Sequence, residues 1–278
     1  MKIKQQYLLT FLLVIFIVQL NANENNTDIY GLLNQAFVKD KDEILDTLFI
    51  QWKTESVSIS KNELSQFPKK KQLTYQLFKK YYSPITEIDN LPKDVKRKYT
   101  NSDSLEMCVP YKKPKYIVVQ DVIIIGIIDS FSKTFKNDEH EIIPYLTEFD
   151  TIFNFYPDID IEDKEILYQN CTYEIGIYNF VLTDIDSVVP NDLDFYRNRF
   201  NERLKRVFFL ENHIGTILGH WGGLHVITLP EVELIVFNRK MTYAMIYYRE
   251  TWFSGGQMLF FRVGSKWIKL FSRNTWME

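Results

Sequence analysis

Cysteine is scarce in this chain, which has only Cys108 and Cys171 among its 278 residues. Two cysteines cannot build a disulfide-rich scaffold, and by themselves they cannot complete a four-ligand zinc site. In an oxidising compartment they form one candidate disulfide, because no odd cysteine is left over. The alternative is two buried thiols that never meet, since geometry decides whether a bridge can form.

The short motifs that mark many catalytic sites are also missing. The chain has no Gly-x-Ser-x-Gly nucleophile elbow, no glycine-rich phosphate loop ending in Lys-Ser or Lys-Thr, and no Cys-x-x-Cys pair. The sequence therefore indicates no cofactor. A hydrolase that uses two carboxylates stays open, because such pairs come from distant positions and leave no local signature.

The chain lacks an excess of basic residues. It has 33 Lys and Arg against 36 Asp and Glu, a formal net charge of −3. Nucleic-acid binding calls for a basic stripe or patch, so no nucleic-acid partner is expected. The hydrophobic fraction of 46% is enough for a substantial core in one large or two small domains, while the oligomeric state stays open.

The first 22 residues predict a secretory signal peptide. Lys2 and Lys4 precede an apolar run over 7–18, and Ala22 provides a small residue before a polar segment. The apolar run is shorter than the roughly 20 residues of a bilayer span, so the mature form should have no membrane span. The alternative is a retained N-terminal anchor. Cleavage places the mature chain in the periplasm or outside the cell, and the Lys- and Asn-rich usage is typical of an AT-rich bacterial genome, here taken as Gram-negative.

Apolar spacing predicts a mainly helical region over residues 23–115. One helix is expected over 28–50 and a second helical segment over 61–82, broken at Pro68. The stretch from Pro84 to Pro114 holds few apolar residues and is expected to be a long connection.

Residues 116–278 are expected to form an α+β region, either as a second domain or as part of one domain overall. A β-branched run over 116–128 predicts a buried strand bent at Gly126, and shorter strands are expected over 150–156 and 173–182. An amphipathic helix follows over 191–211.

The last part of the chain predicts a four-stranded antiparallel meander over 232–276. Short links favour hairpins between successive strands, and the helix over 191–211 is expected to cover the sheet. The fold class is therefore α+β. The expected strands are 232–237, 241–248, 256–263 and 267–276, joined by the links 238–240, 254–256 and 264–265.

The meander carries a pattern that resembles one found in uncharacterised exported proteins of Bacteroidetes. The resemblance covers about a fifth of the chain and implies export and sheet topology, but no catalytic residue. The residues that carry it are Leu229-Pro230-Glu231, Phe237-Asn238, Ala244, Tyr247-Tyr248-Arg249, Gly255-Gly256, Gly264-Ser265-Lys266-Trp267 and Thr275-Trp276.

Three of the four histidines lie close together in sequence, at His213, His220 and His225. Imidazole suits zinc or copper, and nearby glycines would let the loop turn inward. Their spacing matches no compact metal motif, so the alternative is a glycine-rich loop in which they are ordinary polar residues.

The acidic run over 158–163 resembles the start of a calcium loop. Asp163 and Gln169 stand where an EF-hand needs glycine and glutamate, so a solvated acidic turn is the preferred interpretation. Aromatic residues near glycine turns, namely Trp221, Tyr247 and Trp252, are candidates for ligand contact, with packing as the alternative.

These observations favour an exported protein that acts by binding over an enzyme. It could be a periplasmic immunity or inhibitor protein, whose acidic turn over 158–163 meets a basic protein partner, or an envelope accessory protein. The competing hypothesis is a secreted hydrolase that uses carboxylates or a metal held by His213, His220 and His225.

Overall fold

The computed structural model describes residues 29–84, 114–131, 146–182, 193–218, 224–251 and 254–277. They form two compact units, and each unit combines segments that are far apart in the sequence. The first unit includes the described residues of 29–55 and 169–213. The second includes those of 56–168 and 214–277.

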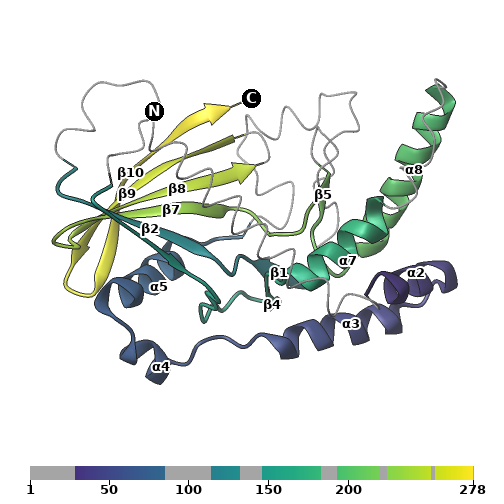
Figure 1. Ribbon diagram of the computed structural model, residues 1–278, viewed down its shortest axis with the longest axis horizontal. Helices are drawn as coiled ribbons and strands as arrows, with labels where there is room; N and C mark the ends of the chain where they lie inside the picture. Colours follow the sequence, from purple (N-terminus) through teal and green to yellow (C-terminus); the bar gives the residue numbers. More distant parts are fainter. Residues whose placement is uncertain are drawn as a thin grey trace. The chain divides into compact units, whose positions relative to one another are not determined.

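The first unit consists of helices (Figure 1). The predicted helix over 28–50 is two helices, because Asp40 adopts a left-handed φ of 51° that ends the first of them. Buried aromatic rings stabilise the unit, and the rings of Trp52 and Tyr173 stack with their centroids 4.8 Å apart. The helices are α2 (Ile29–Lys39), α3 (Asp42–Glu55), α7 (Cys171–Leu182) and α8 (Leu193–Leu210).

The strand predicted over 173–182 is wrong, because these residues belong to α7. Asn170 marks the helix start, since its side chain accepts a hydrogen bond from the Thr172 backbone N–H at 3.0 Å. Its buried residues Tyr173, Ile177 and Phe180 recur at helical spacing. The predominantly apolar sequence hides that period, because apolar residues occur on several sides of the helix.

The second unit contains a six-stranded mixed sheet with the strand order β10-β9-β8-β7-β2-β3 (Figure 1). Its last four strands form the predicted antiparallel meander, and β2 joins them by pairing parallel to β7. The α+β fold class is therefore confirmed. The sheet strands are β2 (Ile123–Ile128), β3 (Glu148–Ile152), β7 (Glu231–Asn238), β8 (Tyr243–Thr251), β9 (Ser254–Val263) and β10 (Lys266–Met277).

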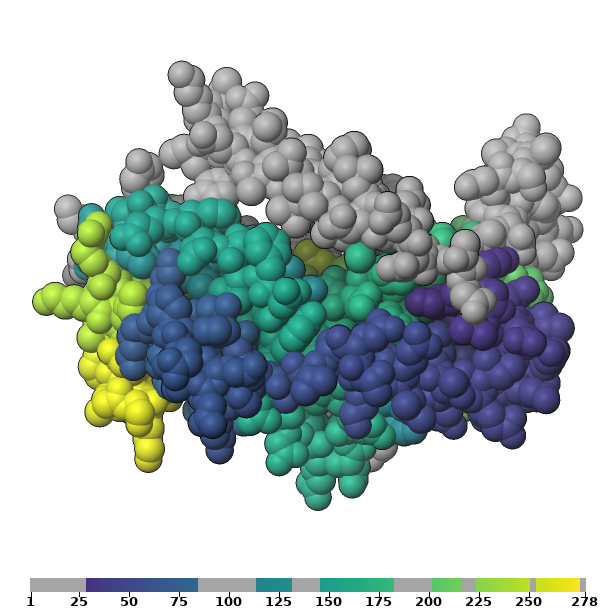
Figure 2. All heavy atoms as spheres, turned by 60° about the horizontal axis from the view of Figure 1, so that its bottom comes forward, coloured from purple at the N-terminus to yellow at the C-terminus, as the bar shows by residue number. Residues whose placement is uncertain are grey.

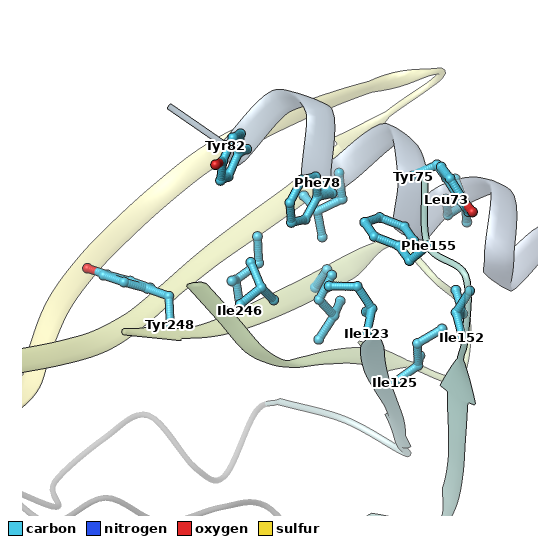
Figure 3. Close-up of a cluster of buried hydrophobic side chains, with 14 of the residues drawn as sticks. Leu73, Tyr75, Phe78, Tyr82, Ile123, Ile125, Ile152, Phe155, Ile246 and Tyr248 are labelled. Atoms are coloured by element: carbon cyan, nitrogen blue, oxygen red, sulfur yellow. The ribbon is translucent and has the colours of Figure 1, made fainter. Parts of the chain in front are cut away.

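One face of this sheet packs on α5 (Lys69–Tyr81), which follows the short helix α4 (Lys61–Gln66). Figure 3 shows Phe78 of α5 above Ile123 and Ile246 of the strands, and all three side chains are fully buried. The blue residues of α4 and α5 also form part of the molecular surface (Figure 2). The prediction that the helix over 191–211 covers the meander is wrong, because α8 belongs to the first unit and α5 supplies this layer.

The predicted strand over 116–128 is two strands in different sheets. β1 (Tyr116–Val119) pairs parallel to β4 (Glu165–Tyr168), whereas β2 joins the six-stranded sheet, and β5 (Ile217–Leu218) pairs separately with β6 (Leu224–His225). β2 runs unbroken through Gly126, where an added Cβ would lie 2.6 Å from the Leu146 side chain. Glycine at this position therefore leaves room for the Leu146 side chain against the strand.

The segment 254–256, predicted as a turn, is the first part of β9. Gly256 pairs with Tyr248 on one side and Asn274 on the other. A Cβ at Gly256 would collide with the carbonyl oxygen of Arg273. Glycine here permits close approach of two strands, a role that a sequence pattern cannot distinguish from a turn.

Gln120, which is 4% exposed, occupies the break between β1 and β2. Its Nε2 donates to the carbonyl oxygens of Val122 at 2.9 Å and Val232 at 2.8 Å. Its Oε1 accepts from the Val232 backbone N–H at 2.6 Å. One buried side chain therefore pairs both backbone polar groups of Val232 near the start of β7.

We expect Gln120→Met to lower the free energy of unfolding by about 3 kcal/mol, because it leaves buried backbone groups without partners. Urea denaturation of the purified protein measures this change. The matched control is Gln76→Met on the exposed side of α5, which should change stability by less than about 0.5 kcal/mol. Equal stability of the two variants would contradict this role of Gln120.

Candidate functional site

The candidate site lies where β7 begins and β8 ends. Glu231 and Arg249 stand opposite each other across these antiparallel strands. Arg249 Nη1 lies 3.6 Å from Glu231 Oε2, and Arg249 Nη2 donates to Glu233 Oε1 at 3.3 Å. One guanidinium therefore lies between two carboxylates, and all three side chains are partly exposed.

A β-bulge places both carboxylates beside the arginine. The pairing of β7 with β8 shifts between Val232 and Leu234, so Glu233 is an extra residue on β7. Val232 and Ile235 consequently both face the core against α5, although they are three residues apart. Glu231 and Glu233 point away from that core, toward the other face of the sheet.

Burial raises the pKa of Glu231 above its usual value, with a further contribution from the charge of Glu233, while Arg249 opposes the shift. Desolvation is the largest of these effects, because it disfavours the charged carboxylate. A carboxyl group of this kind holds its proton to higher pH than an exposed glutamate and can donate a hydrogen bond when protonated.

His225 on β6 lies close enough to Arg249 to be affected by its charge. Burial, assisted by that positive charge, lowers the pKa of His225 to about 4. The imidazole is therefore neutral at pH 7, with one nitrogen able to donate and the other able to accept.

Two tyrosines stand near the same end of the sheet on the α5 side. Burial raises the pKa of Tyr81 well above its usual value, and the neighbouring Tyr248, Glu250 and Glu233 raise it further. The rings of Tyr81 and Tyr248 lie 5.6 Å apart. Both hydroxyls therefore remain protonated at neutral pH, as hydrogen-bonding groups rather than bases.

Gln257 on β9 adds a buried amide to the face that carries Arg249. Gln257 is 1% exposed and pairs with Tyr247, two residues before Arg249 on β8. Its Oε1 accepts from Arg273 Nη2 at 3.3 Å. Within the part of the chain that the structure describes, the Gln257 Nε2 donor has no hydrogen-bond partner.

Two buried polar atoms of the Glu231–Arg249 pair share this condition. Arg249 Nε and Glu231 Oε2 also lack hydrogen-bond partners among the described residues. Buried polar groups in native proteins are nearly always paired, so such atoms call for an explanation such as a bound ligand or water. Two donors and one acceptor at one end of a sheet face form an arrangement suited to recognising a polar ligand.

Two of the three candidate histidines lie in the described residues, and they belong to different units. His213 lies in the first unit, where its Nε2 is 3.4 Å from Asp46 Oδ1 and its ring stacks on Phe49 at 5.1 Å. His225 lies in the second unit, and His220 lies outside the described residues. Across the described segments there is no group of three His, Cys, Asp or Glu side chains placed to hold a metal ion.

Other predicted candidates occupy separate places. Tyr247 is buried in an apolar cluster on the face of the sheet that carries Arg249, whereas Trp221 and Trp252 lie outside the described residues. Cys171 begins α7, and Cys108 also lies outside the described residues, so the disulfide stays a prediction.

The acidic segment 158–163 joins Pro157 to β4 as an irregular turn. Asp158 lies 3.4 Å from Lys79 of α5, so part of its charge is balanced within its own unit. Asp163 has a positive φ of 59°, which aspartate tolerates in turns. This geometry fits the solvated turn better than a calcium loop.

Sequence reasoning missed Glu231, Glu233, Arg249 and Gln257 as site residues. A usable signal was present, because two glutamates spaced by two residues open β7 and an arginine stands near the end of the next strand. Antiparallel pairing brings the start of one strand beside the end of the next. The sequence contains no comparable signal for the bulge at Glu233 or for the burial of Gln257.

None of the helices in the described segments is long and apolar enough to cross a bilayer. Comparison of the chain with protein-family models, curated proteins and solved structures gives no match.

We expect His225 to make stability depend on pH between about 4 and 6.5. In this window the unfolded chain binds more protons at His225 than the folded chain does, so stability falls as pH falls from 6.5 toward 4. The contribution of His225 to this loss is at most about 3 kcal/mol. Urea denaturation at several pH values should show a smaller loss for His225→Gln, and parallel profiles would contradict the assignment.

Proposed function

We propose that this chain is an exported protein that acts by binding a small polar ligand at the shared end of β7, β8 and β9. The observation that carries the proposal is that three buried atoms on one face of these neighbouring strands have no hydrogen-bond partners among the described residues. They are Arg249 Nε, Gln257 Nε2 and Glu231 Oε2. Leaving such groups unpaired costs stability, and a complementary ligand would recover that cost.

The side chains around these atoms support recognition more than proton transfer. Arg249 is held by two carboxylates, which restrict the orientation of its guanidinium. His225 is neutral at pH 7, so it offers one hydrogen-bond donor and one acceptor. Fixed, partly buried polar groups beside apolar residues are typical of small-molecule sites.

The compartment in this proposal follows from the sequence of residues 1–22, which is typical of a secretory signal peptide. We infer a periplasmic or extracellular location, where the exported protein would bind its ligand. In this proposal the ligand binds at the sheet, and the acidic turn over 158–163 has no role in binding a partner protein.

Arg249→Met should abolish retention of the ligand, because it removes the Nε donor and leaves Glu231 and Glu233 without their cation. The protein would be purified from the exported fraction without denaturation, and the compounds it releases on unfolding identified by mass spectrometry. We expect one stoichiometric compound from the wild type and none from Arg249→Met.

The control for this experiment is Arg239→Met. Arg239 also forms an ion pair, with Asp129 at 3.0 Å, but it follows the opposite end of β7. This variant should retain the compound. The same compounds in all three proteins, or none in any of them, would contradict the proposed binding site.

A hydrolase is the second candidate, and the raised pKa of Glu231 beside Glu233 is the observation that favours it. A carboxyl group that keeps its proton to higher pH can act as a general acid beside a second carboxylate. If this is the function, Glu231→Gln should lower kcat on chromogenic glycosides by at least about 100-fold. Glu148→Gln on β3 is the matched control, and no turnover by the wild type on these substrates would reject this candidate.

A further inference from the structure

The charges at the proposed site favour a neutral ligand; this inference rests on the proposed function and concerns the class of that ligand. Arg249 forms ion pairs with both Glu231 and Glu233, and Arg273 adds a second positive charge on the same face of the sheet. The charge of Glu250 helps to raise the pKa values of Tyr81 and Tyr248, on the α5 side. An anion would meet the two carboxylates and a cation would meet the guanidinium, so a full charge gains little here.

The three unpartnered atoms also define which hydrogen bonds the ligand must make. Arg249 Nε and Gln257 Nε2 need acceptors, whereas Glu231 Oε2 needs a donor when it is ionised. Glu231 Oε2 and Arg249 Nε belong to one ion pair, in which Oε2 lies 3.6 Å from Nη1 of the same guanidinium, so the ligand must present a donor and an acceptor close together.

A pair of adjacent hydroxyl groups meets this requirement. Each hydroxyl donates one hydrogen bond and accepts others, so a single oxygen can serve both Glu231 and Arg249. A trans peptide unit cannot do so, because its N–H and C=O point in opposite directions. The second hydroxyl of the pair would accept from Gln257 Nε2, which lies diagonally across the strands from Arg249.

We propose that this end of the sheet binds a neutral saccharide through two adjacent hydroxyls, which hydrogen-bond to Glu231 Oε2, Arg249 Nε and Gln257 Nε2. The Glu231 and Arg249 side chains are 24% and 29% exposed, whereas the three unpartnered atoms are buried, so the saccharide reaches these atoms when the two side chains move apart. Their 3.6 Å ion pair makes no hydrogen bond, so a sugar hydroxyl can insert beside it with little loss.

The test uses the mature protein and saturation-transfer NMR with glucose, galactose, mannose and their disaccharides. N-acetylglycine amide, glycine and acetate serve as probes of the amide, zwitterionic and anionic alternatives. We expect at least one saccharide to bind and to shift the side-chain resonances of Arg249 Nε–H and Gln257 Nε2–H₂. A residue with a purely structural role would show no such saccharide-dependent shift.

Two conservative variants remove single donors while keeping the surroundings similar. Gln257→Met and Arg249→Lys should each weaken saccharide binding by about 10-fold, because each leaves a ligand oxygen without its donor. The control Arg239→Lys keeps wild-type affinity. Circular dichroism of every variant tests whether it is folded. If a variant does not fold, the saccharide-dependent shifts of the Arg249 and Gln257 side-chain resonances in the wild type test the proposal in its place.

The outcomes separate this inference from the proposed function. Binding of N-acetylglycine amide, glycine or acetate in place of every saccharide overturns the saccharide inference and leaves the binding function standing. Saccharide binding that is unchanged in both donor variants also overturns the inference, because the sugar then lies elsewhere. No binding of any probe, together with no compound released from the exported protein, overturns both.

Discussion

The hydrogen bonds of Gln120 to Val232 are the interaction on which the second unit most depends. Gln120 ends β1 and turns the chain toward β2, while its amide pairs with both backbone polar groups of Val232. Val232 in turn stands between Glu231 and Glu233. A single buried amide therefore helps to hold the start of the central strand β7 and the bulge that orients two carboxylates.

The two faces of the six-stranded sheet carry different kinds of side chain. The face against α5 is filled by aliphatic and aromatic side chains, as expected for a core that excludes water (Figure 3). The opposite face begins as an apolar cluster around Met245 and Leu259 and ends in Arg249, Gln257 and Arg273. This change from apolar to polar along neighbouring strands is where a functional site is expected, because it departs from what stability alone would select.

Local pattern was enough for elements with clear ends. The hairpin strands are rich in β-branched and aromatic residues and are joined by short turns, and Pro68 separates two helices as expected. The sequence pattern gave a wrong prediction for α7, because apolar residues occur on several sides of this helix. It also missed that a polar residue inside an apolar run, Gln120, separates two strands. In both cases the contact that decides the structure joins residues more than 100 positions apart in sequence. Tyr173 of α7 stacks on Trp52, and Gln120 bonds to Val232.

The sequence by itself determined the α+β class, the antiparallel meander and an expected export signal, because each depends on residue order over short distances. The tertiary structure alone decided that α5 rather than α8 covers the sheet, since both helices have an apolar face and either could serve. It also decided which polar residues meet. Glu231 and Glu233 reach Arg249 only through strand pairing and a bulge, and Gln257 joins them only because β9 lies beside β8.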